Sequence, residues 1–445
     1  MSDWLEEYKR KSVSADEAVK CIQSGEVVVI PIDTSAKALS HALIRRRHEV
    51  ENVRLLVRSL GADLGWDDKD YRPNIEVIAD TQAGGASTVL NEKKIDFLPF
   101  LSSFRFKGYQ EENPRHAALP IDVAMIVVSP PDKRGYCSFG TYLSNKMDYA
   151  MTAKKVLAEV SEEPFMMVRS PGDNSIHVSQ IDYFVPHIPA PQKQLFSSSP
   201  PTQDEQSVAD HVSTLIRDGD TLHLGPGLVT SSIPLLGALD ERQDLGFHGT
   251  IILPGIFKLI KEGIINGKRK NIDTGKAVSN GLAGKNLSEE DLNFFDGNPM
   301  FEVRTMNYVN DMRVIASQNQ MVAINGILAI DLEGQIAMDS VGYQMFTGPG
   351  GGVDFLMAAM MSKEGCSISV LRSTARRGTI SRIVPALEEG TIVSIPRTFA
   401  DRVVTEYGVA NLFGKTRRQR AQELIAIAHP DFRGELKKQA EKLFG

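Results

Sequence analysis

Short apolar runs alternate with amphipathic segments along the first half of the 445-residue chain. The segment SADEAVKCIQS at 14–24 predicts a helix, because Ser14 can cap its first turn and Gly25 can end it. The run EVVVIPI at 26–32 predicts a short buried strand directly afterwards. The same alternation predicts a helix at 36–46 and strands at 53–59 and 121–131. Strands that alternate with helices are typical of a mostly parallel sheet covered on both faces.

The second half of the chain repeats this order of elements. The segment 208–224 has the same succession of helix, glycine, acidic residue and strand as the segment near the N-terminus, and an Asp-x-x-Gly turn follows a strand in both halves. A segment rich in proline, serine and glutamine separates the halves. We therefore predict two similar open α/β domains, 1–190 and 206–445, joined by a linker at 191–205, with the active-site cleft between them. The matching positions are Gly25 with Gly219, Glu26 with Asp220, Asp132 with Asp331, and Gly135 with Gly334.

Two glycine-rich turns are candidates for ligand binding. The stretch FTGPGGGVDF at 346–355 cannot continue a helix or a regular strand, so its backbone should turn sharply and leave N–H groups free. The apolar run at 353–361 predicts a helix, with Asp354 near its start. Loop and helix together predict an anion-binding concavity suited to a phosphate or a thioester oxygen. A weaker turn of the same kind follows the strand TLHL, at Gly225 and Gly227; in either turn the glycines could equally serve only to reverse the chain.

A basic run follows the glycine-rich stretch. The segment STARRGTISRIVP at 373–385 contains Arg376 and two further arginines, whose guanidinium groups suit phosphates or carboxylates. A solvated basic turn is the alternative interpretation.

Composition narrows the class of protein. The hydrophobic fraction of 42%, the charged fraction of 24% and the net charge of −6 describe an ordinary globular chain, and they argue against nucleic acid as a main partner. The three cysteines form no CxxC pair, which favours reduced thiols and predicts no structural metal. The N-terminus lacks the apolar core of a signal peptide, and no stretch approaches about 18 apolar residues. We therefore expect a soluble, cytoplasmic protein without a membrane partner.

A series of longer motifs then resembles a known family. Their order is DLEGQ at 331–335, DSVG at 339–342, the glycine stretch ending VDF, the basic run, VVTEYGVANL at 403–412 and IAHPDFR at 427–433. This order resembles the acetyl-CoA hydrolase/transferase family, and most of all its 4-hydroxybutyrate CoA-transferase and butyryl-CoA:acetate CoA-transferase branches. The resemblance covers nearly the whole chain, because VSPPDKRGYCSFG at 128–140 also matches.

The resemblance implies both a fold and an activity. The fold is two tandem NagB/RpiA/CoA-transferase-like domains with acyl-CoA bound between them. The activity moves CoA between a short-chain acyl-CoA and a small carboxylate, or hydrolyses the thioester, through a glutamate that carries CoA covalently. It implies coenzyme A as a substrate and no permanently bound cofactor. Family members are usually dimers or higher homo-oligomers.

Carried onto this chain, the resemblance places Thr250 in the slot of the catalytic glutamate, within LGFHGTIILPG at 245–255. Threonine cannot form an acid anhydride as a carboxylate does, so the family's double displacement is in doubt here. Gly352 likewise replaces a glutamine. The positions expected to bind substrate or stabilise an oxyanion are Gly350, Gly351, Asn310, Arg397 and, in the first half, Arg169, and those expected to bind CoA are Gly225, Gly227, Gly348, Asp354 and Arg376.

Several hypotheses follow from the missing glutamate. Thr250 could be acylated with His248 as its base, although a buried structural histidine is the stronger interpretation of His248. Glu406 or Asp354 could instead activate water, which would give a hydrolase, although a structural role is more common for a glutamate such as Glu406. The alternatives are a non-catalytic acyl-CoA-binding subunit that pairs with an intact homologue, and a divergent enzyme that hydrolyses a carbon–carbon bond of an acyl-CoA. We favour an enzyme, because the ligand-binding motifs are retained.

Overall fold

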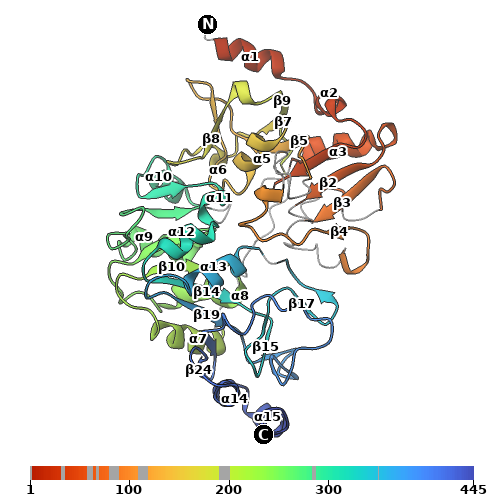
Figure 1. Cartoon of the computed structure of the whole chain (residues 1–445). Coiled ribbons are helices and arrows are strands. Elements are labelled where there is room, and N and C mark those ends of the chain that lie inside the picture. The colour runs from red at the N-terminus through yellow and green to blue at the C-terminus, as the bar shows by residue number, and fades with distance from the viewer. Residues whose placement is uncertain are drawn as a thin grey trace. The chain divides into compact units, whose positions relative to one another are not determined.

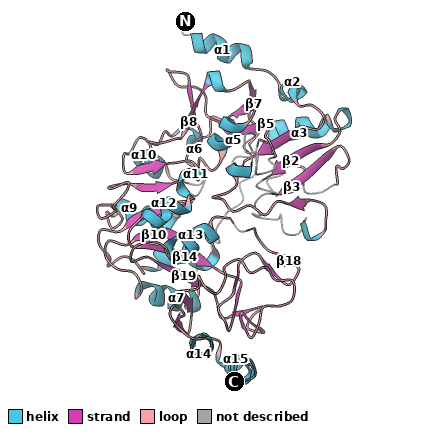
Figure 2. Cartoon of the chain, viewed as in Figure 1, coloured by secondary structure: helices cyan, strands magenta, loops and turns pink. Residues whose placement is uncertain are grey.

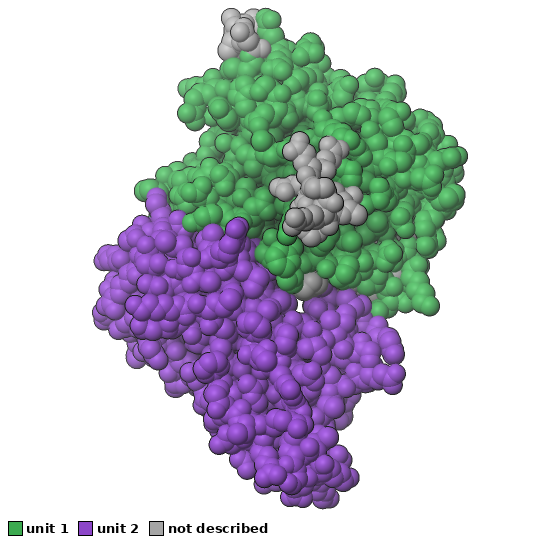
Figure 3. All heavy atoms as spheres, viewed as in Figure 1, with its two compact units in different colours: residues 1–193, 283–308 green, residues 194–282, 309–445 purple. Residues whose placement is uncertain are grey.

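The computed structural model describes residues 3–31, 36–57, 64–66, 70–79, 90–108, 119–189, 201–282, 287–348 and 350–445. The chain forms two compact units, coloured separately in Figure 3. Unit 1 contains residues 1–193 and 283–308, and unit 2 contains residues 194–282 and 309–445. Most of the predicted linker, 191–200, lies outside the described residues.

The segment 283–308 returns to unit 1, whereas a single boundary at the linker would assign it to the second domain. Hydrogen bonds within unit 1 explain this return. The backbone N–H of Arg169 donates to Asp296 at 2.5 Å, and the N–H of Asp173 donates to the Val303 carbonyl at 2.7 Å. The predicted domains 1–190 and 206–445 therefore remain a prediction. The compact units divide the chain differently, because 283–308 belongs to unit 1.

Unit 1 is built on a parallel sheet with strand order β4-β3-β2-β1-β5-β7-β9 (Figures 1 and 2). Every residue of β5 (Val123–Val128) is buried, as expected for a central strand covered on both faces. Its side chains join those of β1 in one apolar core. The other strands of this unit are β1 (Val27–Ile30), β2 (Val53–Val57), β3 (Ile75–Ala79), β4 (Asp96–Phe97), β6 (Tyr136–Ser138), β7 (Lys155–Val160), β8 (Ser175–His177), β9 (Tyr183–Pro186) and β13 (Phe301–Val303).

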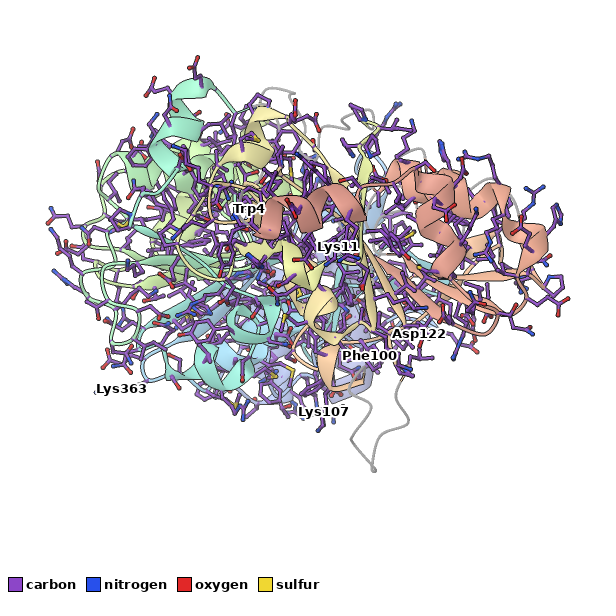
Figure 4. All side chains as sticks on the ribbon, turned by 90° about the horizontal axis from the view of Figure 1, so that it is seen from above. Trp4, Lys11, Phe100, Lys107, Asp122 and Lys363 are labelled. Atoms are coloured by element: carbon purple, nitrogen blue, oxygen red, sulfur yellow. The ribbon has the colours of Figure 1, made fainter. Side chains whose placement is uncertain are left out.

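The helices of unit 1 are short. They are α1 (Asp3–Lys11), α2 (Ala15–Ala18), α3 (Lys37–Arg45), α5 (Lys146–Thr152), α6 (Pro164–Met167) and α10 (Glu289–Phe295), with 3-10 turns η1 (Val19–Cys21), η2 (Arg47–Glu49), η3 (Phe106–Gly108) and η4 (Val178–Gln180). Figure 4 labels Trp4 and Lys11 on α1, and the Lys11 ammonium donates to the Val178 carbonyl at 3.1 Å. This bond fixes α1 to η4.

The unit 2 strands of a second sheet run in the order β12-β11-β10-β14-β19-β23-β24. All neighbours pair in parallel except β23 and β24, which form an antiparallel hairpin. Its strands are β10 (Thr221–Leu224), β11 (Gly246–Gly249), β12 (Ala277–Ser279), β14 (Met321–Gly326), β19 (Cys366–Val370), β23 (Arg402–Thr405) and β24 (Gly408–Asn411). Smaller ladders use β15 (Ala329–Asp331), β16 (Ile336–Ala337), β17 (Ser340–Val341), β18 (Gln344–Met345), β20 (Thr374–Ala375), β21 (Ile380–Ser381) and β22 (Ile383–Val384).

The helices of unit 2 include the predicted helix after the glycine-rich stretch. They are α7 (Gln203–Ser213), α8 (Leu228–Ser232), α9 (Pro254–Lys261), α12 (Met312–Ser317), α13 (Gly352–Ala359), α14 (Arg417–Ala426) and α15 (Pro430–Phe444), with the 3-10 turn η5 (Ile233–Leu236). The short α11 (Met306–Val309) spans the chain boundary at 308 and 309. Among the described helices, no segment combines the length and apolarity required to cross a lipid bilayer.

The two sheets share one topology, which confirms the prediction of two similar α/β folds. In unit 1, β1 lies between β2 and β5; in unit 2, β10 lies between β11 and β14. The glycines before the central strands adopt the same left-handed conformation, with φ of +81° at Gly25 and +84° at Gly219. Each donates its N–H across to the loop before the next strand, at 2.9 Å and 3.0 Å respectively.

The repeated Asp-x-x-Gly turn is also the same in both units. The Asp132 carboxylate accepts from two backbone N–H groups, two and four residues ahead, and the Asp331 carboxylate does the same. Gly135 and Gly334 close the turns with φ of +84° and +95°. The two units therefore share the hydrogen bonds of this turn as well as the topology of their sheets.

One predicted helix is shorter than expected. At 14–24 the Ser14 hydroxyl caps the first turn by accepting from Glu17 N–H at 3.2 Å, but α2 ends at Ala18 and η1 replaces its last turn. The Glu17 carboxylate accepts from the Lys20 ammonium at 2.6 Å.

Candidate active site

Three turns of unit 2 lie at one edge of its sheet. Gly225 follows β10, Thr250 follows β11, and Asn325 lies near the end of β14. Because β10 lies between β11 and β14 and all three run parallel, their carboxyl ends meet at this edge. Ligands of open parallel sheets bind beyond the carboxyl ends of the strands.

The glycine-rich stretch contacts the predicted catalytic slot. A Cβ atom placed on Gly351 would lie 2.4 Å from Asn310 Nδ2 and 3.0 Å from Thr250 Cγ2. Asn310 is fully buried and donates its amide to the Asp354 carboxylate at 3.2 Å. The structure therefore brings together four residues singled out from the sequence, Thr250, Asn310, Gly351 and Asp354. We call them the Thr250 cluster.

The loop before α13 presents several backbone N–H groups. The carbonyl of Asp339 accepts from the N–H groups of Phe346 and Thr347 and so anchors the start of the loop. Within the described part of the chain, no backbone hydrogen bond outside the regular helices and strands engages the N–H of Gly350, Gly351 or Gly352. Gly350 adopts a left-handed φ of +51°. These donors at the start of α13 suit a developing negative charge on oxygen.

Gly348 and Pro349 complete this loop. The carbonyl of Gly348 accepts from the Thr347 hydroxyl at 3.2 Å. Pro349, part of the predicted stretch, lies outside the described residues.

The first glycine turn is packed against the second. A Cβ on Gly225 would lie 2.0 Å from Asn325 Oδ1, and one on Gly352 would lie 3.3 Å from the same oxygen and 2.7 Å from Met338 Cε. Glycine at both positions therefore serves close approach rather than unusual backbone angles. Gly227 begins α8, and its carbonyl accepts from the Ser231 N–H at 2.9 Å.

His248 is buried and its ring contacts groups outside the Thr250 cluster. Its Nε2 donates to the Val309 carbonyl at 2.9 Å, and its Nδ1 lies 3.4 Å from the Gln318 amide. Burial, together with the positive charge of Lys270, lowers the pKa of His248 to about 4. These contacts favour the structural interpretation of His248, and its role as a base for Thr250 stays a prediction.

Two buried side chains near this edge gave no signal in the sequence. His223, in β10, stacks on the Phe355 ring with centroids 3.6 Å apart and planes 7° apart. Burial lowers the pKa of His223 to about 3, so the ring is neutral. Asn325 touches both glycine turns, as described above. A lone histidine or asparagine in an apolar run looks like any core residue, and only the strand order makes them neighbours of the turns.

Glu406 has a separate environment. Its carboxylate accepts from the Ser373 hydroxyl at 2.5 Å and from the Ser373 N–H at 2.9 Å. It lies in the turn between β23 and β24, and its described contacts include no member of the Thr250 cluster. This arrangement fixes the start of the β20–β21 segment and is the geometry of a structural carboxylate.

The described contacts of the three predicted arginines are with other residues. Arg397 forms an ion pair with Glu333. Arg376 lies at the exposed turn between β20 and β21 with a left-handed φ of +46°. Arg169, in unit 1, donates to the Tyr136 carbonyl at 3.4 Å. Their assignment to substrate or CoA therefore stays a prediction.

The polar groups of the Thr250 cluster include amides and a carboxylate. Across the described ranges, no cluster of three or more histidine, cysteine, aspartate or glutamate side chains has the arrangement of a metal site. What the Thr250 cluster offers is a set of amide donors and one buried carboxylate.

Comparison with known proteins decides the family. Residues 2–191 match the N-terminal domain of acetyl-CoA hydrolase/transferase, and residues 288–440 match its C-terminal domain. The chain belongs to the acetyl-CoA hydrolase/transferase family. This finding confirms the resemblance predicted from the motifs, and with it an enzyme of the CoA-transferase or hydrolase type. The non-catalytic alternative and the carbon–carbon hydrolase are not favoured.

Relatives of this family member align over its full length. It is 36% identical over 455 residues to 4-hydroxybutyrate coenzyme A transferase of Clostridium kluyveri, which covers 99% of this chain and 100% of that protein. The crystal structure of RipA from Yersinia pestis is 29% identical with a TM-score of 0.88 and covers 99% of both chains. The 4-hydroxybutyrate CoA-transferase of Porphyromonas gingivalis is 33% identical with a TM-score of 0.75 and covers 99% of this chain and 100% of its own. These likenesses confirm the predicted CoA-transferase-like α/β fold.

Proposed function

We propose that this protein transfers CoA between a short-chain acyl-CoA and a small carboxylate at the Thr250 cluster. One observation supports this most: Thr250, Asn310 and Gly351 converge at the carboxyl edge of the sheet, beside N–H groups that make no loop hydrogen bond to another described residue. Such donors stabilise the oxyanion formed when a thioester is attacked. Coenzyme A enters as a substrate, and the proposal requires no resident cofactor.

The group that attacks the thioester distinguishes this proposal from the double displacement that the family resemblance implies. We propose that the acceptor carboxylate itself occupies the space beside Thr250 and attacks the thioester carbonyl. The carbon–sulfur bond breaks, CoA leaves as a thiolate, and a mixed anhydride of the two acids forms. The thiolate then attacks the carbonyl carbon of the acceptor acid, which gives the new thioester and releases the first acid as a carboxylate. Atoms and charge balance, and no group on the protein is acylated.

Hydrolysis is the competing outcome at the same centre. Water in place of the acceptor would need a base, and Asp354 is the carboxylate of the cluster. Asp354 is engaged with the Asn310 amide at 3.2 Å, and water attack would give a free acid and free CoA instead of a new thioester.

The test follows acyl-CoA exchange and free CoA together by mass spectrometry, with butyryl-CoA as donor and a panel of carboxylates. We expect a new acyl-CoA that appears only with an acceptor, and initial-rate plots that intersect because both substrates must bind together. Free CoA at the same rate with or without acceptor would show a hydrolase. Neither product with any acceptor would refute the proposed function.

Two variants of Thr250 separate the possible nucleophiles. Thr250→Ala should keep transfer, because the hydroxyl is not acylated in this mechanism. Thr250→Glu should change the kinetics to double displacement, with parallel initial-rate plots and a covalent CoA adduct visible in the intact-protein mass. Loss of all transfer in Thr250→Ala, with the fold retained, would assign the nucleophile to threonine instead.

Self-association into a dimer or a higher homo-oligomer is a further part of the proposal. Light scattering of the purified protein tests it, and a monomer at all concentrations would contradict it.

A further inference from the structure

Two neutral polar side chains lie buried below the glycine turns without a described function. His223 is 1% exposed and Asn325 is 4% exposed. Among the described residues, the Nδ2 of Asn325 has no hydrogen-bond partner, and neither ring nitrogen of His223 makes a well-aligned hydrogen bond. A buried polar group without a partner costs about 1–3 kcal/mol, and native proteins retain few of them. Their retention at this place therefore calls for a physical reason.

Asn325 sits at the junction of both turns. Its Oδ1 lies between Gly225 and Gly352, at positions where a Cβ would come within 2.0 Å and 3.3 Å of it. Gly352 is the neighbour of Gly351, which contacts Thr250. Asn325 therefore lies against Gly352, the residue next to Gly351 of the Thr250 cluster. The atom of its side chain that has no described partner is Nδ2, which is a donor.

His223 supports this position from the adjacent strand. Its ring is stacked flat on Phe355 of α13, and its Nδ1 lies 3.0 Å from a Cβ placed on Gly249, the residue before Thr250. The Asn325 side chain lies within hydrogen-bonding range of the His223 ring, and this contact opposes the lowering of the His223 pKa that burial causes. The stacked ring cannot turn freely, so it restricts the space open to the amide.

We propose that the Asn325 amide donates a hydrogen bond to the thioester carbonyl oxygen of bound acyl-CoA, and that His223 is a positioning residue that holds this amide in place. The inference rests on the proposed function and adds a side-chain donor to the backbone donors of the glycine loop. The donor is unpaired without substrate and gains its partner on binding. Its bond strengthens as negative charge develops on the oxygen, so it favours the transition state over the bound substrate.

Asn325→Ala is the central variant, and Asn174→Ala is its matched control. Asn174 is a 2% exposed asparagine of unit 1 whose Nδ2 already donates to the Gly140 carbonyl at 2.7 Å and to Ser170 at 2.8 Å. We expect Asn325→Ala to lower kcat by about 10²–10³, the usual effect of removing one oxyanion donor, with little change in the KM of acyl-CoA. The control should lower the unfolding midpoint and leave kcat within about threefold, because its bonds are structural.

The positioning role of His223 needs a separate variant. His223→Phe keeps the stack on Phe355 and removes both ring nitrogens, so the unfolding midpoint should stay equal or rise. We expect kcat to fall by about tenfold in the wild-type background and not at all in Asn325→Ala, because the two residues act through one bond. Equal effects in both backgrounds would refute the positioning role.

A second measurement does not depend on turnover. The infrared carbonyl stretch of butyryl-CoA labelled with ¹³C at the thioester carbon should shift to lower frequency on binding the wild-type protein and the control, and less on binding Asn325→Ala. An unchanged shift in Asn325→Ala, or a kcat equal to that of the wild type, would overturn the inference while leaving the proposed function standing. Failure of the wild type to bind butyryl-CoA would overturn both.

Discussion

Gly351→Ala probes the contact on which the Thr250 cluster depends. The backbone at Gly351 has φ of −99° and ψ of −5°, which alanine adopts without strain. The added methyl group would instead meet Asn310 Nδ2 at 2.4 Å and Thr250 Cγ2 at 3.0 Å. Carbon needs about 3.5 Å or more from a non-bonded atom, so one partner must move by about 1 Å. Asn310 is fully buried and bonded to Asp354, so it has little freedom to move.

The expected loss follows from this crowding. Over-packing of this kind costs about 1–3 kcal/mol of unfolding free energy, and each kcal/mol lowers the midpoint by about 2–4 °C for a unit of this size. A displacement of about 1 Å at a reacting centre also costs up to about 100-fold in rate. We expect Gly351→Ala to lower both the thermal midpoint and kcat/KM for acyl-CoA exchange.

Gly326→Ala is the control, because a Cβ there meets no atom within 4 Å. Its unfolding free energy should stay within about 0.5 kcal/mol of the wild type. The decisive assay is a double-mutant cycle by urea denaturation with Asn310→Ala, which vacates the space. Gly351→Ala should then cost less than in the wild type. If it costs the same in both backgrounds, Asn310 does not exclude the side chain and the reasoning is wrong.

Two further predictions concern carboxylates outside the cluster. Burial raises the pKa of Asp339 to about 6, although a hydrogen bond from Ser394 opposes this shift. The ionised carboxylate therefore destabilises the fold, and the unfolding free energy falls as the pH rises through about 6. Asp339→Asn should therefore raise the unfolding free energy at pH 8, by up to about 3 kcal/mol, and should lose this advantage near pH 4; a difference that does not vary with pH in urea titrations would contradict this. Glu406→Gln and Ser373→Ala should each cost about 1–3 kcal/mol, and the double variant less than their sum, because both alter the bond from the Ser373 hydroxyl to Glu406. Transfer should survive in all three, and its loss in Glu406→Gln at unchanged stability would instead give Glu406 a catalytic role.

The sequence by itself determined the fold class and its duplication. Buried strands such as β5 are continuous apolar runs, and the turns at Gly25 and Gly219 depend on residues a few positions apart. Such signals are local, so the chain alone reveals them. The motifs from residue 331 onward likewise carried the family, because their order along the chain is itself the signal.

Only the tertiary structure decided which of the predicted site residues act together. Thr250, Asn310 and Gly351 are far apart in the chain, and the order of strands in the sheet makes them neighbours. Glu406 also lies in one of the family-like motifs, but its carboxylate accepts a hydrogen bond from Ser373. The sequence does not single out His223 and Asn325, because their burial and their hydrogen bonding depend on residues that are distant in the chain. Contacts between distant residues arise from the packing of the sheet, and no local pattern encodes them.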